Sequence, residues 1–535
     1  MSAQQAVSGA RRDETAGPAV PARWRRWAWP AGYAVAAVAL FFCYLRLSGT
    51  QKVTSDGASM ALQAWDMLHG NLLLHGWTVA DVSFWTTELP EYALIEAVRG
   101  LGAPDVHVAA AITYTLLVVG AGLVAKGRAT GAEGLARVLI ASGIMIAPQL
   151  GQGTLIVLLA PDHTGTGVPL LVTWLILDRA GRRWWVPPAI GLLLAWTLVG
   201  DRVAEVLAVL PLVLVYGVRA AGGLIRREPR RQVWFDVSMA CAAVGAYVAS
   251  IGVGALVVAL SGFRLQPVRL HHAPVSVLAG NALRTADGVL ALFGAEFYRQ
   301  QSGVAVALGL VHLVGLAMAV VAVGIGLRRF PRSDDPLVSV LSAGFVINIA
   351  VYLFSTMPVS AWSTREIAGV LPAGAVLAGR LLAGPVVRAR LGPPLLAAAG
   401  AVYLVALGYG MAQPQLPAEG QNLADWLVAR HLSNGLTGYG FGPTTTLASG
   451  GRVQLRQAAF SPGRVSPGPE EDNLGWYDPS AHDATFLVLA PRPSKWAPLT
   501  PARARGIFGP PAHAYRVDGQ FVVWTYRYNL LARVR

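Results

Sequence analysis

The sequence predicts a mainly α-helical, polytopic membrane protein that carries a small extracytoplasmic α/β domain at its C-terminal end. First, 54% of its 535 residues are hydrophobic, only 13% are charged, and the mean hydropathy is +0.48. A soluble domain is normally about one quarter charged. Second, the apolar runs are continuous, which indicates helices, and a helix of roughly 20 apolar residues crosses a bilayer. Third, Pro, Gly and charged residues become frequent near residue 412.

About eleven transmembrane helices are expected within a domain over residues 28–411. The apolar segments lie at 28–47, 107–125, 135–152, 165–178, 186–200, 203–218, 236–260, 303–326, 337–355, 367–383 and 393–411. The first segment lacks a convincing small-residue cleavage site, so we interpret it as a retained helix and not as a signal peptide.

The distribution of charge predicts the orientation of these helices, because Lys and Arg concentrate in cytoplasmic loops. A cytoplasmic N-terminus places six segments inside: 1–27, 126–137, 178–185, 219–233, 327–336 and 384–392. They hold 21 basic and 7 acidic residues, and the remainder holds 22 of each, so the entire net charge of +14 lies on one side. The basic loop at 219–231 is then explained by its cytoplasmic position next to anionic lipid, and it gives no reason to predict nucleic-acid binding.

This orientation predicts a multi-pass protein of the cytoplasmic membrane. The strong preference for Arg over Lys, with abundant Ala, Gly and Pro, is typical of a GC-rich bacterial genome. Residues 1–27 form a basic cytoplasmic tail, and residues 412–535 form an outer soluble domain. A helix after residue 422 and strands at 453–455, 485–489 and 521–526 indicate a mixed α/β fold for that domain, suited to support or acceptor binding.

The first outer loop, residues 48–106, is unusually acidic for a segment that follows a membrane helix. A simple anchor does not need such a loop, whereas a membrane enzyme needs a general base in a wet cavity beside the bilayer. The seven acids are Asp56, Asp66, Asp81, Glu88, Glu91, Glu96 and Asp105.

Polar motifs also stand at later outer boundaries. Asp162 and His163 precede the fourth predicted span, Arg202 follows the fifth, and Arg365 lies at the entry to the tenth. Asp56, the helix predicted to follow it, and the second acid Glu88 resemble the first outer loop of the GT-C superfamily of integral membrane glycosyltransferases. The resemblance extends in order over most of the chain, and protein O-mannosyltransferases and aminoarabinose-transferase-like bacterial proteins are the nearest types. Many members carry paired acids at the first site, where this chain has Asp56 followed by Gly57.

The resemblance implies an enzyme that transfers a sugar from a polyprenyl-phosphate carrier to an unidentified acceptor outside the membrane. Asp56 would then take the proton of the acceptor hydroxyl, since a carboxylate of ordinary pKa is ionised at neutral pH. Glu88, with Glu91 as its competitor, would stabilise the oxocarbenium-like transition state. Arg365 and Arg202 would hold the phosphate.

Several alternatives stay open at this stage. Three roles stay open for Asp162 and His163: binding a divalent cation, polarising the phosphate or capping a helix. No metal site or other cofactor is predicted, because a single His without a cluster of further ligands does not make one. The chain is alternatively a transporter or flippase for a lipid-linked envelope precursor, or a catalytically silent membrane scaffold. We see no internal repeat of the kind common in transporters, and the charges cluster at the outer boundary, which favours interfacial chemistry.

Overall fold

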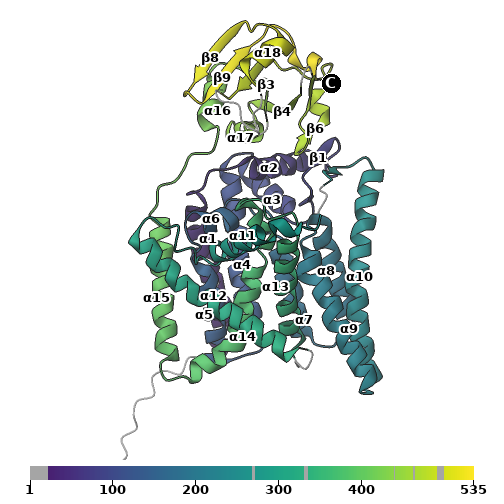
Figure 1. The fold of residues 1–535 in the computed structure, drawn as a ribbon, viewed down its shortest axis with the longest axis vertical. Coiled ribbons are helices and arrows are strands. Elements are labelled where there is room, and N and C mark those ends of the chain that lie inside the picture. Colours follow the sequence, from purple (N-terminus) through teal and green to yellow (C-terminus); the bar gives the residue numbers. More distant parts are fainter. Residues whose placement is uncertain are drawn as a thin grey trace, which may run out of the picture.

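A computed structural model places a bundle of helices beneath a C-terminal domain that sits on one end of it (Figure 1). The structure describes residues 22–267, 271–330, 335–438, 440–461, 464–490 and 499–534. Most of the predicted basic tail, residues 1–21, therefore lies outside the described residues.

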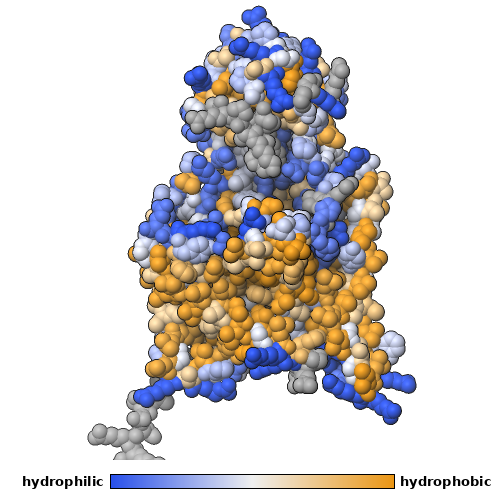
Figure 2. Space-filling view, viewed as in Figure 1, coloured by the Kyte–Doolittle hydropathy of each residue, from blue (hydrophilic) through white to orange (hydrophobic). Residues whose placement is uncertain are grey.

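Every one of the eleven predicted spans corresponds to a helix in the described part of the chain. These helices are α1 (Ala22–Ser48), α4 (Pro104–Lys126), α5 (Gly131–Ile146), α7 (Gly167–Ala180), α8 (Val186–Gly200), α9 (Leu210–Ile225), α10 (Arg230–Ala259), α12 (Gly303–Arg329), α13 (Pro336–Phe354), α14 (Val370–Arg388) and α15 (Gly392–Met411). Figure 2 shows an apolar belt around the bundle with hydrophilic rims above and below it.

Length separates these helices into two groups. Among the described residues, eight helical stretches are long and apolar enough to cross a membrane, two of them with a short π or 3-10 turn included at their start. By contrast α5, α7 and α8 have 16, 14 and 15 residues, fewer than the roughly 20 that a perpendicular span needs. Two of these short helices adjoin the polar turns around Asp162 and Asp201, where the chain leaves the helical path. These turns lie at the end of the bundle nearest the C-terminal domain, which is called the outer end below.

Short helices gather at the outer end of the bundle, below the C-terminal domain (Figure 1). They are α2 (Ser55–Leu68), α3 (Leu89–Arg99), α6 (Gln152–Val157), α11 (Val275–Leu292) and the 3-10 turn η2 (Trp362–Ile367). Helix α2 is amphipathic and buries Ala58, Ala61 and Ala64 along one face. The sequence analysis missed α11, because Arg284 and Asp287 interrupt its apolar pattern.

The C-terminal domain is built on a six-stranded mixed sheet of order β5-β4-β3-β7-β9-β8. Its strands are β3 (Asn434–Thr437), β4 (Gln454–Ser461), β5 (Arg464–Pro467), β7 (Phe486–Leu489), β8 (His513–Val517) and β9 (Phe521–Thr525). The three central strands β4, β3 and β7 run parallel, and the outer pairings are antiparallel. The helices are α16 (Gln421–Ala429), α17 (Gly442–Ala448) and α18 (Pro501–Phe508). The three predicted strands correspond to β4, β7 and β9.

A second, three-stranded sheet connects this domain to the outer end of the bundle. Strand β1 (Trp77–Val79) of the first outer loop pairs with β6 (Asp472–Asn473) of the C-terminal domain and with β2 (Arg264–Leu265). The Trp77 ring meets the edge of Trp476 at 5.0 Å between centroids, and α17 packs on α2. These contacts fix the acidic segment before β6 above the start of α2.

Candidate active site

Two aspartates from distant parts of the chain share one arginine at the outer end of the bundle. Nη1 of Arg365, in η2, donates to Oδ2 of Asp56 at 3.0 Å and to Oδ2 of Asp162. The side chains of Arg365 and Asp56 are 21% and 20% exposed, whereas that of Asp162 is 8% exposed. The guanidinium group also lies 4.8 Å from the centroid of the Trp362 ring, a distance suited to a cation–π contact. The structure thus brings together three of the residues predicted from sequence.

Close packing at the start of α2 explains why a glycine follows Asp56. A Cβ atom on Gly57 would lie 2.8 Å from Cγ1 of Val106 and 3.2 Å from the Cβ of Ala160. There is no room for the second acid that many relatives of the resembled superfamily carry. The contact presses the first turn of α2 against α4 and the loop after α6, and so holds Asp56 next to the loop that carries Asp162.

His163 anchors that loop from the side opposite Arg365. Its backbone has φ of +56°, a left-handed conformation that costs energy for a non-glycine residue. Nδ1 lies 3.0 Å from Oδ2 of Asp201, and Nε2 lies 3.2 Å from Oε1 of Glu366. Burial alone would lower the pKa of His163, but Glu366 and Asp201 raise it well above its ordinary value. Both ring nitrogens therefore face acids, and this arrangement favours the protonated ring.

Asp201 completes this support. It is fully buried at the end of α8, accepts a hydrogen bond from Oγ1 of Thr166 at 2.6 Å, and accepts another from the backbone N–H of Val203 at 2.9 Å. Burial favours a higher pKa, yet the contacts with His163, Thr166 and Val203 hold the pKa of Asp201 below its ordinary value. The His163 ring thus lies between two acids, Asp201 and Glu366.

Glu88 lies behind the loop and not at the shared arginine. It is fully buried, and neither carboxyl oxygen has a hydrogen-bond partner among the described residues. Its carboxyl group packs on the loop backbone, since a Cβ on Gly165 would lie 2.6 Å from Oε1 of Glu88. Burial, with the charge of Asp201 as a smaller cause, raises the pKa of Glu88 well above its ordinary value. Burial therefore favours the protonated form of Glu88.

Two further predicted residues lie apart from the shared arginine. Glu91, in α3, accepts a hydrogen bond from Oγ1 of Thr113 at 2.6 Å, and burial raises its pKa to about 7. Arg202 is 57% exposed and pairs with Oε1 of Glu205 at 2.6 Å, with its guanidinium 6.0 Å from the Tyr247 ring centroid.

The C-terminal domain contributes an acid that the sequence analysis did not select. Glu471 is buried, 8% exposed, and has φ of +52° just before β6. Burial, together with the nearby charges of Asp56 and Asp162, raises its pKa well above its ordinary value. The available signal was the run Glu470-Glu471-Asp472. Its link to the first outer loop depends on the pairing of β6 with β1, which no local pattern predicts.

Charge and shape suggest what this cluster can do. Arg365 is a fixed cation with two acidic partners, one of them partly accessible. Beside it, Asp162, Trp362 and Arg365 line a recess whose other wall is Leu155, Ile156, Leu159 and Ala160. The recess has a volume of about 10 Å³, no more than one water molecule needs, so an anionic headgroup would bind beside Arg365 only if the lining moved apart. Among the described residues, no group of three or more His, Cys, Asp or Glu side chains is arranged to hold a metal ion.

Comparison with known proteins supports the fold but gives no family assignment from sequence. No protein-family model matches the chain, and no curated protein matches it. The crystal structure of ArnT from Cupriavidus metallidurans in the apo state superimposes with a TM-score of 0.54 at 14% identity. The match covers 94% of this chain and 98% of that one. An oligosaccharyltransferase from Archaeoglobus fulgidus, tethered to an acceptor peptide, is more distant, with a TM-score of 0.45 and 10% identity over 87% of this chain and 70% of that one.

The shared fold therefore spans both the bundle and the C-terminal domain. The chain has the GT-C fold of membrane glycosyltransferases, as the sequence resemblance predicted.

Proposed function

We propose that this protein is an integral membrane glycosyltransferase that moves a sugar from a polyprenyl-phosphate carrier to an acceptor at the outer face. The observation that carries the proposal is the Asp56–Arg365–Asp162 cluster at the outer end of a bundle with the GT-C fold. The proposal places the transmembrane domain at residues 28–411 and the outer domain at 412–535.

Asp56 is the proposed general base. It is the more accessible of the two aspartates on Arg365, and it stands in the first turn of α2 under the outer domain. In the proposed step the acceptor oxygen bonds to the anomeric carbon, and its proton passes to Asp56. The bond between that carbon and the phosphate oxygen breaks, so the electron pair leaves with the polyprenyl phosphate. A displacement of this kind inverts the configuration of the sugar.

Arg365 is the proposed phosphate-binding residue. It lies against the apolar recess formed by α6 and the following loop, where an isoprenoid chain has hydrophobic surface to cover. A donor phosphate competes with Asp56 for the guanidinium, because Nη1 of Arg365 now serves both aspartates. Donor binding would release the Asp56 carboxylate and leave Asp162 to hold the arginine, which couples loading of the donor to activation of the base.

The remaining residues near the cluster have other proposed roles: some position the loop that carries Asp162, and one contacts the acceptor. We propose His163 and Asp201 as positioning residues, because they fix the loop of Asp162 from behind. Glu88 packs on the same loop through Gly165, so its proposed part in transition-state stabilisation requires that it lose its proton in the donor complex. Glu471 faces Asp56 from the outer domain and is the proposed contact on the acceptor side.

The decisive experiment compares purified wild type with Asp56→Asn. The substrates are a polyprenyl-phosphate-linked sugar pool and native membrane acceptors, and the readout is labelled product. The amide keeps the size of the side chain but cannot take the proton, and loss of a positioned base costs roughly 10²–10⁴ in rate. Asp425→Asn, on the exposed part of α16, is the matched control and should keep full activity.

The outcome separates the proposal from its rivals. Equal product formation by wild type and Asp56→Asn removes Asp56 as the base. Carrier translocation without sugar transfer by wild type would favour a flippase, and the absence of both activities would favour a silent scaffold.

Binding of the carrier tests Arg365 separately. Arg365→Ala and Arg365→Lys should both weaken binding of polyprenyl phosphate, since an ammonium group lacks the two-pronged donor geometry of a guanidinium. Unchanged binding in Arg365→Ala would exclude this residue as the phosphate ligand.

Orientation is also a proposal, with the N-terminus in the cytoplasm and the C-terminal domain outside. The charge segregation supports it. Reporter fusions after Gly222 and Gly420 should report opposite compartments, and the same compartment for both would contradict the proposed topology.

A further inference from the structure

A second polar cavity lies at the end of the bundle opposite the C-terminal domain. Its volume is about 680 Å³, and its walls come from the turns after α4 and α7, from α9 and α10, and from α13 and α14. Five arginines line it: Arg128, Arg182, Arg219, Arg226 and Arg380. Four acids line it as well: Asp178, Glu228, Asp236 and Asp335. Nothing in the proposed transfer reaction uses this cavity.

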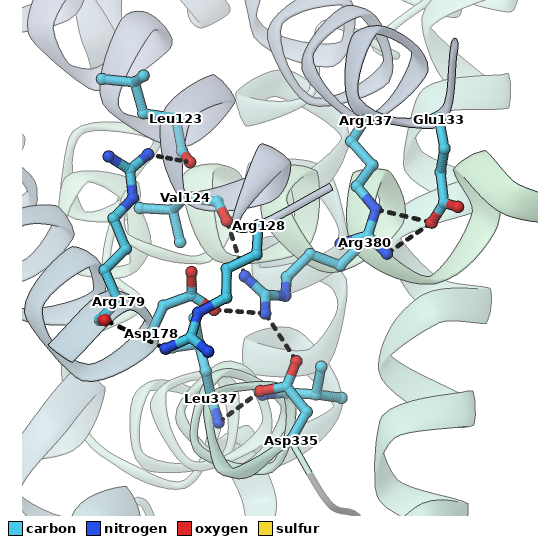
Figure 3. A network of polar contacts seen from close by, with 11 residues as sticks. Leu123, Val124, Arg128, Glu133, Arg137, Asp178, Arg179, Asp335, Leu337 and Arg380 are labelled. Atoms are coloured by element: carbon cyan, nitrogen blue, oxygen red, sulfur yellow. Dashed lines mark hydrogen bonds and ion pairs between the residues drawn. The ribbon is translucent and has the colours of Figure 1, made fainter. Parts of the chain in front are cut away.

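Arg380 lies in a buried part of the cavity lining, within a network of polar contacts (Figure 3). Its Nη2 donates to Asp178 at 2.6 Å and to Asp335 at 2.7 Å, and its Nη1 donates to the carbonyl oxygen of Val124 at 2.8 Å. The Arg380 and Asp178 side chains are each 8% exposed. Two of the four acids are therefore already paired with this one arginine.

The other two acids also lie beside arginines. Oδ2 of Asp236 is 3.8 Å from Nε of Arg219, and Oε1 of Glu228 is 4.0 Å from Nη1 of Arg226. The remaining arginines, Arg128 and Arg182, have no acidic oxygen within 4.0 Å among the described residues, although Arg182 also interacts electrostatically with Asp236. With five arginines and four acids, the lining carries a net charge of +1.

These two arginines come from neighbouring turns, and both line the cavity. Nη2 of Arg128 donates to the carbonyl oxygen of Arg179 at 3.1 Å, at the end of α7. The same nitrogen is 3.9 Å from the position that a Cβ on Gly181 would take. Gly181 has φ of +64° and makes the turn into Arg182. The guanidinium of Arg128 thus lies over the turn that presents Arg182, and both face the same opening.

We propose that this cavity binds a phosphate group, with Arg128 and Arg182 as its two gripping residues. Guanidinium groups bind phosphate through charge-assisted, often bidentate hydrogen bonds. Figure 2 shows a hydrophilic rim below the apolar belt, at the end of the bundle opposite the C-terminal domain, the depth at which phospholipid headgroups lie. The phosphate is carried either by a lipid or by a soluble molecule. The proposal is independent of the transferase function.

The test measures binding to the full-length protein, purified in detergent and stripped of lipid, near physiological salt. The probes are dioctanoyl phosphatidic acid, inorganic phosphate and, as the phosphate-free control, dioctanoylglycerol. We expect saturable binding of one phosphatidic acid or one inorganic phosphate and none of dioctanoylglycerol. Arg128→Gln and Arg182→Gln should each weaken it about tenfold, as expected for loss of one charge-assisted contact.

Arg231→Gln is the matched control, because Arg231 is an exposed arginine on the same face, in the first turn of α10, and does not line the cavity. It should change binding less than twofold. Equal losses in Arg231→Gln and Arg182→Gln would overturn the proposal, because they would indicate a diffuse basic surface. Binding of neither phosphate probe, or equal binding of dioctanoylglycerol, would overturn it too.

The two phosphate probes identify the source. Tighter binding of phosphatidic acid than of inorganic phosphate assigns a lipid headgroup, and equal binding assigns a soluble phosphate. Thermal unfolding of each variant shows that the exposed substitutions leave the fold intact.

Discussion

Arg365 and Arg380 stand at opposite ends of one helical stretch, Trp362–Arg388, and each is held by two aspartates. In both, one guanidinium nitrogen serves the two aspartates. Their surroundings differ. Arg380 is 8% exposed and also bonds a backbone carbonyl, whereas Arg365 is 21% exposed. The inner arginine is closed by the fold. The outer one keeps part of its guanidinium accessible and has a partner that a ligand can displace.

The comparison teaches that the same residue set can serve stability or binding, depending on exposure. A buried arginine cannot be removed without leaving buried carboxylates uncompensated. A partly exposed arginine can exchange partners at lower cost, because water and ligands reach the guanidinium and its carboxylate partner. Four predictions would break or sharpen this contrast.

The largest expected effect is on stability at the inner cluster. Arg380→Ala leaves the buried Asp178 without its cation, and breaking a buried pair costs about 3–5 kcal/mol. We expect a large fall in the melting temperature in detergent and a low yield of folded protein. Arg365→Ala is the matched variant. It also leaves Asp162 without its cation, but Arg365 is 21% exposed and water can replace it, so the melting temperature should fall less than in Arg380→Ala while activity is lost. Equal destabilisation by the two substitutions would contradict the contrast between them.

The next effect concerns the loop that carries Asp162. Gly165→Ala places a methyl group 2.6 Å from Oε1 of Glu88, and overpacking of this kind costs about 1–3 kcal/mol. We expect roughly tenfold lower transferase activity, because the loop must move away from Arg365. Adding Glu88→Ala makes room and should restore part of the activity, so the double-mutant cycle is non-additive. Gly245→Ala, which meets no atom within 4 Å, is the neutral control.

A third, smaller effect depends on pH through His163. Its pKa is raised in the folded protein, so the stabilisation by Asp201 and Glu366 is fully present below the unfolded value near 6.5. It is lost as pH rises toward the folded pKa, by about 1.4 kcal/mol per pH unit between the two values. The difference in melting temperature between wild type and His163→Asn should be largest near pH 6 and shrink toward pH 9. A difference that grows with pH would mean that the ring is neutral.

The smallest effect is expected at Arg202. Its partner Glu205 lies three residues away on the surface, and an exposed pair of this kind contributes about 1 kcal/mol or less. Arg202→Ala should therefore leave the melting temperature almost unchanged and the activity within about twofold of wild type. A loss of carrier binding comparable to that of Arg365→Ala would show that Arg202 also contacts the phosphate, as the sequence analysis predicts.

The sequence by itself determined the class of the protein and the course of its helices. Continuous apolar runs require helices in a bilayer, and each of the eleven predicted segments corresponds to one. The local sequence also selected Asp56, Asp162 and Arg365, because each polar residue interrupts the chain beside a long apolar run. Such a position is costly unless the residue meets a partner or water.

Only the tertiary structure decided which of these residues meet. Asp56 and Arg365 are 309 positions apart, and hydrophobic periodicity records burial without recording which neighbour a side chain faces. Glu88 and Arg202 show the consequence, since equally plausible polar residues lie behind the loop and on the surface. Glu471 reaches the cluster only because β6 pairs with β1. Pairings between distant segments follow from the packing of whole elements, and the local chain carries no record of them.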